Sequence, residues 1–362
     1  MAGRMYADAL VFTGGGTGGH FFPAVALAEG ARARWGLPIC FVGAVRGIEA
    51  RLLPQSPWPF ELVDVEGLVG RSPLRSARSL WKLGAARRSL LAQWRLHRPL
   101  AVVGTGGYGA APAILAARAL GIPYFLHESN ATPGLLVKLL SRRAAGVWCG
   151  MEDCLRALPG ARCLHVGTPV REAFLRSFTP VGNLQPPRRL LVLGGSGGAR
   201  ALNEALLEAA PALLERFPHW DILHQTGAGA FEDLSARPRH PRHRLAPFLE
   251  FMDTQMEAAS LVLTRSGAST CAELTASGRP ALMVPLPGSA GDHQVANARA
   301  MEAGGRARVV IQGPDLAARL AEAAGALMAD PPSLEALARP LPNRAVDLCL
   351  DDLAARTGMV LH

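Results

Sequence analysis

Two glycine-rich turns of the same kind stand half a chain apart, and each could hold a phosphate group. The first, 14–20, follows the apolar run 9–13, and the second, 194–199, follows 189–193. Each turn leads into an alanine- and leucine-rich segment with a helical pattern. We therefore expect each turn to offer backbone N–H groups and the positive end of a helix dipole to an anion.

Two side chains at these turns could take part in catalysis. His20 stands at the start of a predicted helix, where the dipole lowers the pKa of an imidazole and keeps it able to accept a proton near neutral pH. A packed histidine without a chemical role is the alternative. Ser196 completes a G-x-S-x-G pattern, which is also the nucleophile elbow of serine hydrolases, with His224 or His293 as a candidate base. That interpretation leaves the first glycine turn unexplained.

Further polar clusters follow other predicted strands. A third glycine cluster, 104–109, follows one strand, and His127, Glu128 and Asn130 follow the next. Because open α/β sheets bind ligands at the carboxyl ends of their strands, these segments are expected to approach a diphosphate and to bind sugar hydroxyls.

The second half of the chain carries a comparable cluster at 264–270. Its hydroxyl and N–H groups could bind a phosphate at a helix N-terminus, and Glu273, one helical turn further on, could reach a ribose diol. The same residues could instead form a helix cap in which Glu273 completes a capping box. A further polar segment, 291–297, opens another helix after a strand.

These clusters need alternating strands and helices to position them. Apolar runs predict strands at 9–13, 39–43, 60–65, 100–104, 122–127, 146–150, 163–166, 189–193, 221–224, 245–249, 261–264, 281–285 and 308–311. Helical patterns occur at 19–35, 74–97, 111–120, 133–141, 171–177, 199–216, 252–259, 269–277, 293–303, 315–328, 333–339 and 344–358. This alternation is typical of βα units in mainly parallel sheets, so the expected fold class is α/β.

Length and composition suit two such domains. The chain has 362 residues, of which 49% are hydrophobic, enough for two cores. The aperiodic, proline-rich segment 178–187 is the expected linker between an N-terminal domain, 1–177, and a C-terminal domain, 188–343. The last helix, within 344–362, is expected to pack back on the first domain.

Several classes of protein are disfavoured. No apolar stretch is long enough to span a membrane, and the N-terminus lacks a signal-peptide pattern, so the expected compartment is the cytosol. Six scattered cysteines indicate buried thiols and neither a zinc site nor a disulfide framework. A dinucleotide site is disfavoured because residues 43–45 carry no acidic side chain, and a P-loop is excluded because no lysine follows a glycine.

The net charge of +9 predicts an acidic partner. In 68–126 there are basic residues but no acidic ones, and a helix at 71–82 would align them in a stripe. That stripe and the apolar residues beside it suit an anionic membrane surface, although a plain solvated face is the alternative: Arg71, Leu74, Arg75, Arg78, Trp81 and Lys82. A different face, formed by Leu80, Leu83, Leu90, Leu91 and Trp94, is the expected core side. Nucleic acid is not expected, because no nucleic-acid motif is present.

Taken together and in order, these motifs resemble the MurG family of N-acetylglucosaminyltransferases, which convert lipid I to lipid II in peptidoglycan synthesis. The resemblance covers nearly the whole chain and rests on these segments: 15–20 with Pro23, 106–108 with Pro112, 127–130, 166–171, 194–200, 224–227, 265–268 with Glu273, and 294–298. Three positions depart from the family pattern: Ser129, Thr168 and Gly197.

The resemblance implies a GT-B fold, in which two Rossmann-like, doubly wound domains face a central cleft. It implies that the first domain binds the acceptor through Gly106, Gly107, Tyr108 and His127. It implies that UDP-N-acetylglucosamine is contacted by Thr17, Gly18, Gly19, Asn130, Arg171, Ser196, Leu249, Ala268, Ser269, Thr270, Glu273, Gln294 and Asn297. Uracil would meet the backbone near Leu249, and the ribose would meet Glu273. The diphosphate would meet Ser196 and the helix N-terminus at 268–270, and the sugar would meet Gln294 and Asn297.

The implied reaction is an inverting transfer from the α-linked donor to the C4 hydroxyl of the muramyl sugar of an undecaprenyl-linked acceptor. His20 is the first candidate for the base and Glu128 the second. Helix N-termini would stabilise the leaving diphosphate, and no metal or cofactor is required, with magnesium left open. The enzyme would sit peripherally on the cytoplasmic face of the cell membrane, where other cell-wall synthesis proteins are further candidate partners. Another GT-B transferase, or a hydrolase using Ser196, stays an alternative.

Overall fold

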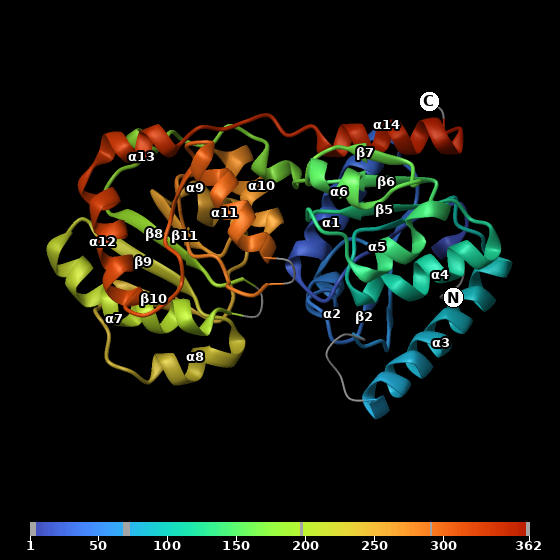
Figure 1. The fold of residues 1–362 in the computed structure, drawn as a ribbon, viewed down its shortest axis with the longest axis horizontal. Coiled ribbons are helices and arrows are strands. Elements are labelled where there is room, and N and C mark those ends of the chain that lie inside the picture. The colour runs from blue at the N-terminus through green and yellow to red at the C-terminus, as the bar shows by residue number, and fades with distance from the viewer. Residues whose placement is uncertain (1–4, 68–72, 196–197, 290–291, 360–362) are drawn as a thin grey trace. The chain divides into compact units, whose positions relative to one another are not determined.

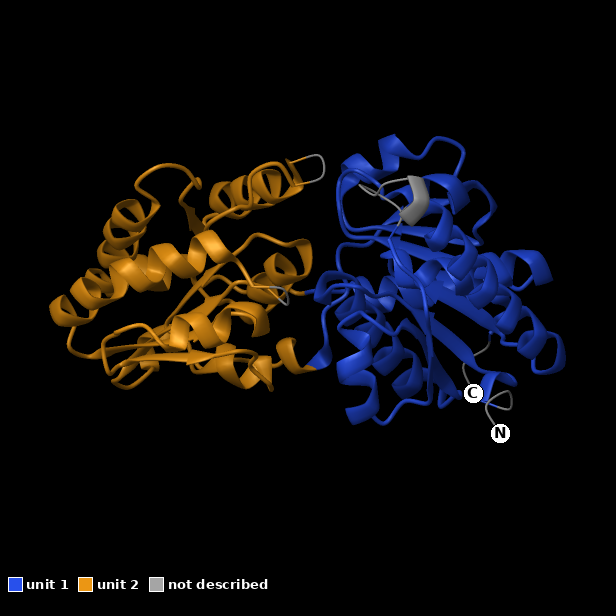
Figure 2. Ribbon diagram, turned by 90° about the horizontal axis from the view of Figure 1, so that it is seen from below, with its two compact units in different colours: residues 1–172, 343–362 blue, residues 173–342 orange. Residues whose placement is uncertain are grey.

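The structure is a computed structural model that describes residues 5–67, 73–195, 198–289 and 292–359, with the backbone alone for 73–75. The chain divides into two compact units, residues 1–172 with 343–362, and residues 173–342 (Figure 2). The segment 178–187, expected as a linker, belongs to the second unit. The predicted domain boundaries therefore differ in detail from the boundaries of these two units, and they stay a prediction.

The first unit is built on a seven-stranded parallel sheet in the order β3-β2-β1-β4-β5-β6-β7 (Figure 1). Its strands are β1 (Leu10–Thr13), β2 (Ile39–Ala44), β3 (Phe60–Val63), β4 (Ala101–Gly104), β5 (Tyr124–Glu128), β6 (Gly146–Cys149) and β7 (Cys163–His165). The central strands are buried along their whole length. A parallel sheet covered on both faces requires such continuous apolar runs.

Helices cover both faces of this sheet and carry the chain between its strands. They are α1 (Gly18–Trp35), α2 (Glu49–Leu52), α3 (Pro73–Leu96), α4 (Ala111–Leu120), α5 (Leu135–Leu140), α6 (Glu152–Ala157) and α14 (Ala345–Thr357). The C-terminal α14 contacts α1 and β6. Gly30 leaves room for Val346, and the Trp148 indole donates to Asp352 at 2.8 Å. These contacts fasten the last helix to the first unit.

The second unit repeats the design with six parallel strands in the order β10-β9-β8-β11-β12-β13. The strands are β8 (Arg188–Leu193), β9 (Trp220–Gln225), β10 (His243–Ala246), β11 (Leu261–Thr264), β12 (Ala281–Met283) and β13 (Ala307–Val309). The helices are α7 (Arg200–Arg216), α8 (Ala228–Ser235), α9 (Met252–Glu257), α10 (Ala268–Ser277), α11 (His293–Ala303), α12 (Leu316–Ala329) and α13 (Pro331–Leu337).

The two sheets share a feature of their strand order. In both, the strand order reverses beside the first strand of the unit, between β1 and β4 and between β8 and β11. Ligands of open α/β sheets bind at the carboxyl ends of the strands at such a reversal. Each of the two predicted glycine turns leaves the sheet at this point.

The predicted α/β class with two doubly wound, parallel-sheet domains is confirmed. The predicted helix at 171–177 is wrong, because only Glu172–Phe174 forms a 3₁₀ turn and Arg176 pairs instead with Glu257 of α9 at 2.6 Å. The strand expected at 245–249 lies at His243–Ala246. Within the described residues, no helix is long and apolar enough to cross a membrane.

Candidate active site

His20 lies in the first turn of α1, against the turn that follows β4. Its Nδ1 is 3.1 Å from the carbonyl oxygen of Thr105, and the Thr105 hydroxyl donates to the carbonyl of His20 at 2.6 Å. A carbonyl oxygen only accepts, so Nδ1 must carry the proton in this contact. The neutral ring therefore has its lone pair on Nε2, the tautomer that a general base needs.

The electrostatic surroundings also keep His20 neutral. Burial lowers the pKa of this imidazole below its usual value, while the charge of Glu128, the hydrogen bond to Thr105 and the charge of Glu49 act in the opposite direction. Because burial prevails, the ring is neutral at pH 7 and able to accept a proton.

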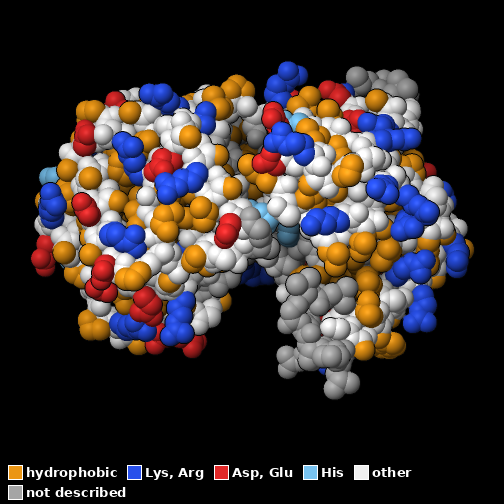
Figure 3. Space-filling model, in the orientation of Figure 1, with side chains coloured by type: hydrophobic (Ala, Val, Ile, Leu, Met, Phe, Trp, Pro, Cys, Tyr) orange, Lys and Arg blue, Asp and Glu red, His pale blue; other side chains and the backbone are white. Residues whose placement is uncertain are grey.

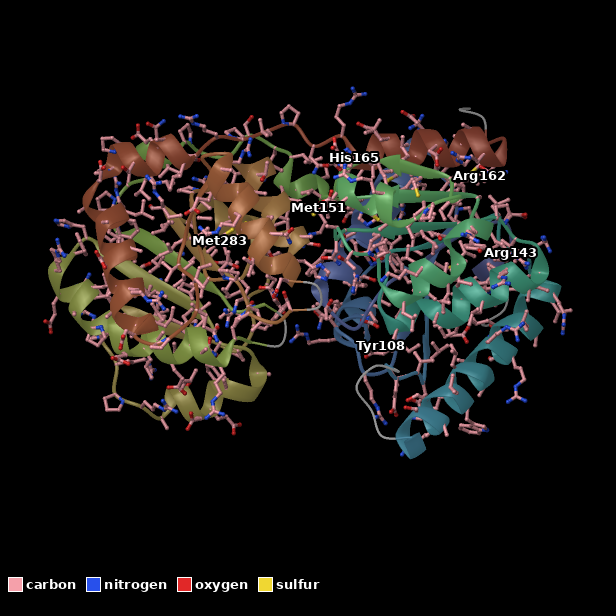
Figure 4. All side chains as sticks on the ribbon, viewed as in Figure 1. Tyr108, Arg143, Met151, Arg162, His165 and Met283 are labelled. Atoms are coloured by element: carbon pink, nitrogen blue, oxygen red, sulfur yellow. The ribbon has the colours of Figure 1, made fainter. Side chains whose placement is uncertain are left out.

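Glycines let the turn after β4 approach His20 closely. Gly106 and Gly107 both have positive φ, at 100° and 77°. A Cβ on Gly106 would lie 2.7 Å from Nδ1 of His20, and one on Gly107 would lie 2.0 Å from the carbonyl oxygen of Gly15. Tyr108, labelled in Figure 4, follows directly and packs its ring on Gly16. The predicted acceptor residues 106–108 thus lie next to His20.

Glu128, the second candidate base, ends β5 and organises the loop after it. One carboxylate oxygen accepts from the backbone N–H of Asn130 at 3.0 Å and from its Nδ2 at 2.9 Å, and the other accepts from the N–H of Gly134 at 2.8 Å. The side chain is buried. Because both carboxylate oxygens already accept hydrogen bonds from this loop, Glu128 is suited to positioning Asn130.

His127 is buried completely. Its Nε2 lies 3.0 Å from the carbonyl oxygen of Gly167, and its Nδ1 lies 3.5 Å from the hydroxyl of Ser129. Burial lowers its pKa. These contacts indicate that His127 supports the carboxyl edge of the sheet, and direct contact with an acceptor stays a prediction.

The remaining predicted donor residues of the first unit lie near α1. Thr17 is the N-cap of α1 and is exposed, as is Gly19, with Gly18 between them. The guanidinium carbon of Arg171 stands 4.2 Å above the ring centroid of Phe22. A cation on an aromatic face is held in place, so Arg171 has a fixed position beside the start of this helix.

In the second unit, the glycine turn after β8 is braced by Gln225, a residue of the motif 224–227 to which the sequence analysis assigned no role. Ser196 and Gly197 lie outside the described residues. The amide of Gln225 accepts from the N–H of Leu249 at 2.9 Å and donates to the carbonyl of Gly195 at 3.4 Å. Because the N–H of Leu249 already donates to Gln225, the backbone group of Leu249 that suits a nucleobase is its carbonyl. Gln225 is polar at a buried strand end, which is the signal that could have indicated this role.

The turn after β11 leads into α10 with an open N-terminus. A Cβ on Gly267 would meet nothing within 4 Å. Ala268, Ser269 and Thr270 form the first turn of α10, and Glu273 is buried one turn further along. A helix of ten residues that opens on space, with hydroxyls in its first turn, suits a phosphate.

Asn297 and Gln294 of α11 form hydrogen bonds with Ser266, in the turn before α10. Asn297 is buried and donates from Nδ2 to the carbonyl of Ser266 at 3.0 Å, while the Ser266 hydroxyl donates to the carbonyl of Gln294 at 2.7 Å. The side-chain oxygen of Gln294 accepts from the N–H of Leu286 at 3.0 Å. Asn297 is thus placed as a support, and the contact of Gln294 with a sugar stays a prediction.

His224 does not have the surroundings of a hydrolase base. It is fully buried between Asn203, whose Oδ1 is 3.0 Å from Nε2, and His243, whose Nε2 is 3.3 Å from Nδ1. Burial, with the neighbouring His243, lowers its pKa to about 3. No carboxylate orients the ring in these contacts, which argues against Ser196 as a nucleophile activated by His224.

The helix expected to carry the basic stripe is only partly as predicted. Arg71 and the side chains of Leu74 and Arg75 lie outside the described residues. Arg78 is exposed and Trp81 is 67% exposed. Lys82 corrects the prediction, because its ammonium is buried and pairs with Glu66 at 2.6 Å and Asp64 at 2.9 Å.

Leu80 is a second correction on α3. It was expected in the core and is 55% exposed beside Trp81. Leu135 and Leu139 of α5 are exposed as well, with Lys138 between them. Figure 3 shows apolar side chains gathered with Lys and Arg on the first unit, over the region that α3 and α5 occupy in Figure 1.

Metal ligands do not cluster in the part of the chain that the structure describes. Within residues 5–67, 73–195, 198–289 and 292–359, no group of three His, Cys, Asp or Glu side chains is placed to hold a metal ion. The described cysteines are free thiols.

Comparison with known proteins places both units in one family. Residues 10–149 match the glycosyltransferase family 28 N-terminal domain, and residues 189–347 match the family 28 C-terminal domain. A UDP-N-acetylglucosamine--N-acetylmuramyl-(pentapeptide) pyrophosphoryl-undecaprenol N-acetylglucosamine transferase of Syntrophotalea carbinolica is 41% identical over 307 residues, 84% of this chain and 85% of that protein. Its namesake in Alkalilimnicola ehrlichii is 41% identical over 343 residues, 90% of this chain and 91% of that protein.

A solved structure agrees with these relatives. The crystal structure of Acinetobacter baumannii MurG superposes with a TM-score of 0.66 at 27% identity, covering 95% of this chain and 98% of that one. The fold is therefore GT-B, and the chain belongs to glycosyltransferase family 28, within the MurG group of N-acetylglucosaminyltransferases.

Proposed function

We propose that this chain transfers N-acetylglucosamine from UDP-N-acetylglucosamine to the C4 hydroxyl of the muramyl sugar in a pyrophosphoryl-undecaprenol acceptor. Relatives named for this reaction match about nine tenths of the chain, through both units. The observation that carries the proposal further is the contact between His20 and Thr105, because it fixes the base-competent tautomer at the switch point of the first sheet.

His20 is the proposed base. Its Nε2 accepts the proton of the attacking hydroxyl as that oxygen forms a bond to the anomeric carbon of the donor and the bond to the UDP oxygen breaks. Attack on an α-linked donor from the opposite face gives a β1,4 linkage. Glu128 then acts as a positioning residue for the 128–134 loop, since its oxygens already accept three hydrogen bonds.

The donor is proposed to bind mainly to the second unit. The open N-terminus of α10 takes the diphosphate and stabilises the charge that grows on it as UDP leaves. Glu273 binds the ribose, the carbonyl of Leu249 meets uracil, and Gln294 meets the sugar. Thr17, Gly18, Gly19, Asn130 and Arg171 are the proposed contributions of the first unit, and Ser196 keeps its predicted role at the diphosphate.

The first unit is proposed to bind the acceptor and to hold the enzyme peripherally on the cytoplasmic face of the membrane. Exposed Leu80, Trp81 and Leu139 supply apolar contacts, while Arg78 and Lys138 supply positive charge to anionic lipids. Lys82 has no part in this surface. Contacts with other cell-wall synthesis proteins stay a prediction.

Incubation with radiolabelled UDP-N-acetylglucosamine and a lipid I analogue tests the reaction. We expect label in the lipid fraction with the wild-type chain and none without acceptor. Release of free sugar alone, with no labelled lipid, would reject the proposal. A fluorophosphonate that labels Ser196 would favour the hydrolase alternative instead.

A further inference from the structure

The first glycine turn already contains an anion, the carboxylate of Glu49. This residue starts α2, five positions after the last residue of β2, and its side chain is completely buried. The backbone N–H of Gly16 donates to both carboxylate oxygens, at 2.9 and 3.1 Å, and the N–H of Ala44 donates to Oε1 at 3.0 Å. The N–H of Gly16 belongs to the turn that would otherwise offer it to a phosphate.

Glycines form the cavity that holds this carboxylate. A Cβ on Gly15 or Gly47 would lie 2.0 or 2.1 Å from a carboxylate oxygen, and one on Gly43 would lie 2.6 Å from Cγ. None of Gly15, Gly43 and Gly47 has a positive φ. Their lack of a side chain is therefore explained by the space that Glu49 needs and not by the backbone conformation.

The glycine turn after β8 differs at the corresponding strand end. Gly195 is exposed, and a Cβ there would meet nothing within 4 Å. Gly198 of that turn lies against backbone, because a Cβ there would lie 2.4 Å from the carbonyl oxygen of Thr226. The two turns look alike in sequence, yet at Gly16 the first holds an internal anion, whereas Gly195 of the second is exposed.

We infer that Glu49 is a positioning residue, which fills the anion position of the first turn, holds that turn against β2 and so places His20 for catalysis. It follows that neither the donor nor the acceptor diphosphate is bound by the N–H of Gly16. The inference rests on the proposed role of His20, but it concerns a residue that no motif of the family resemblance includes.

An electrostatic link makes the inference testable. Glu49 raises the pKa of His20, against the larger effect of burial. The other groups that act on His20 are Glu128 and the Thr105 carbonyl, and His127 of β5 interacts with it as well. Removing the charge of Glu49 must then lower the pKa of His20 further, whereas a purely structural side chain would leave it unchanged.

The first experiment compares the pH dependence of kcat for the wild type and Glu49→Gln, which preserves shape and removes charge. We expect kcat to fall by about 100-fold through misplacement of His20, and the acid limb to move to lower pH. The KM for the lipid acceptor should stay unchanged. If the turn bound the acceptor diphosphate, loss of the negative charge would lower that KM, and this result would overturn the inference.

Glu61→Gln is the matched control. Glu61 is also a hydrogen-bonded carboxylate of the first unit, accepting from Tyr6 at 2.7 Å and from Gln93 at 3.0 Å, but it has no contact with the first turn. Its pH profile should coincide with that of the wild type. An acid limb of Glu49→Gln that also coincides with the wild type, in a folded and active variant, would overturn the inference while leaving the proposed function intact.

A rescue experiment keeps the inference testable if Glu49→Gln folds poorly. Glu49→Ala empties the cavity, and sodium formate should restore part of kcat by supplying a carboxylate to Gly16 and Ala44, whereas sodium chloride at the same ionic strength should not. Gly47→Ala keeps the charge but displaces the carboxylate, so it should lose activity without formate rescue. Equal effects of formate and chloride on Glu49→Ala would contradict the inference.

Discussion

His20 and Thr105 hold each other by two opposed hydrogen bonds: the Thr105 carbonyl oxygen lies 3.1 Å from Nδ1, and the Thr105 hydroxyl donates to the His20 carbonyl at 2.6 Å. The pair joins the start of α1 to the end of β4 across the reversal in strand order. Ring orientation and tautomer are thus set by the scaffold before any substrate binds.

Thr105→Val should lower kcat about tenfold and leave the KM for UDP-N-acetylglucosamine within about twofold, because the base is displaced while donor groups are untouched. Steady-state kinetics with saturating acceptor measure both constants. Thr105→Ser keeps the hydroxyl and is the control, which should retain most of kcat. A valine variant with the wild-type kcat would show that this hydroxyl does not position His20.

The dependence of kcat on pH should follow the neutral form of His20. Its pKa is lowered by burial, so activity should persist below about pH 6.5, the usual histidine value, and decline only at lower pH. His20→Ala should remove this limb and lower kcat by about 100-fold or more. An acid limb above pH 7 would contradict a His20 ring that is neutral at pH 7.

Glu273→Gln should raise the KM for UDP-N-acetylglucosamine by about 10- to 100-fold with a small change in kcat, since a hydrogen bond to a charged group contributes about 1.5–3 kcal/mol. Glu232→Gln, on the exposed surface of α8, removes the same charge as a control. A donor KM equal to the wild type would exclude Glu273 from the ribose site.

The positions of these side chains were predictable from the sequence to different degrees. Strand ends and glycine turns follow from local apolar runs, so the surroundings of His20 and Glu273 could be expected. The contact of Glu49 with Gly16 could not be expected, because Gly16 lies 33 positions away and becomes a neighbour only when β1 and β2 pair. The hydrogen bond of His127 likewise needs Gly167, which lies on a later loop.

The helix α3 shows the same limit. Periodicity placed Lys82 in a basic stripe, but Glu66 and Asp64, from the segment after β3, neutralise and bury it. Their hydrogen bonds raise the pKa of Lys82, Glu66 contributing most. A helical pattern identifies faces of one element and contains no information about which other element covers each face.

Neutralising Arg78 and Lys138 together, as Arg78→Gln with Lys138→Gln, should weaken binding to anionic vesicles by about 30-fold, since each basic residue near such a surface contributes about 1 kcal/mol. Vesicle co-sedimentation measures the affinity. Arg299→Gln with Arg308→Gln removes equal charge from exposed positions of the second unit and should have little effect. Equal losses in both double variants would indicate a response to net charge alone.

The stacked imidazoles of His224 and His243 should make the second unit sensitive to acid. Burial lowers their pKa values to about 3 and about 4. In the unfolded chain they take up protons near pH 6.5, whereas the folded rings do not, so stability is lost as the pH falls from about 6.5 toward 4. Urea unfolding at pH 7 and pH 4.5 should show this loss, and His243→Phe should reduce it. An unchanged pH dependence in that variant would argue against the histidine pair.

The most direct test is the structure of the product made from UDP-N-acetylglucosamine and a lipid I analogue. Proton NMR of the purified product should show one added N-acetylglucosamine in β-linkage to the C4 oxygen of the muramyl sugar, formed by the wild type and at least about 100-fold more slowly by His20→Ala. An α-linkage, transfer to another hydroxyl, or equal rates for the two proteins would contradict direct displacement with His20 as the base.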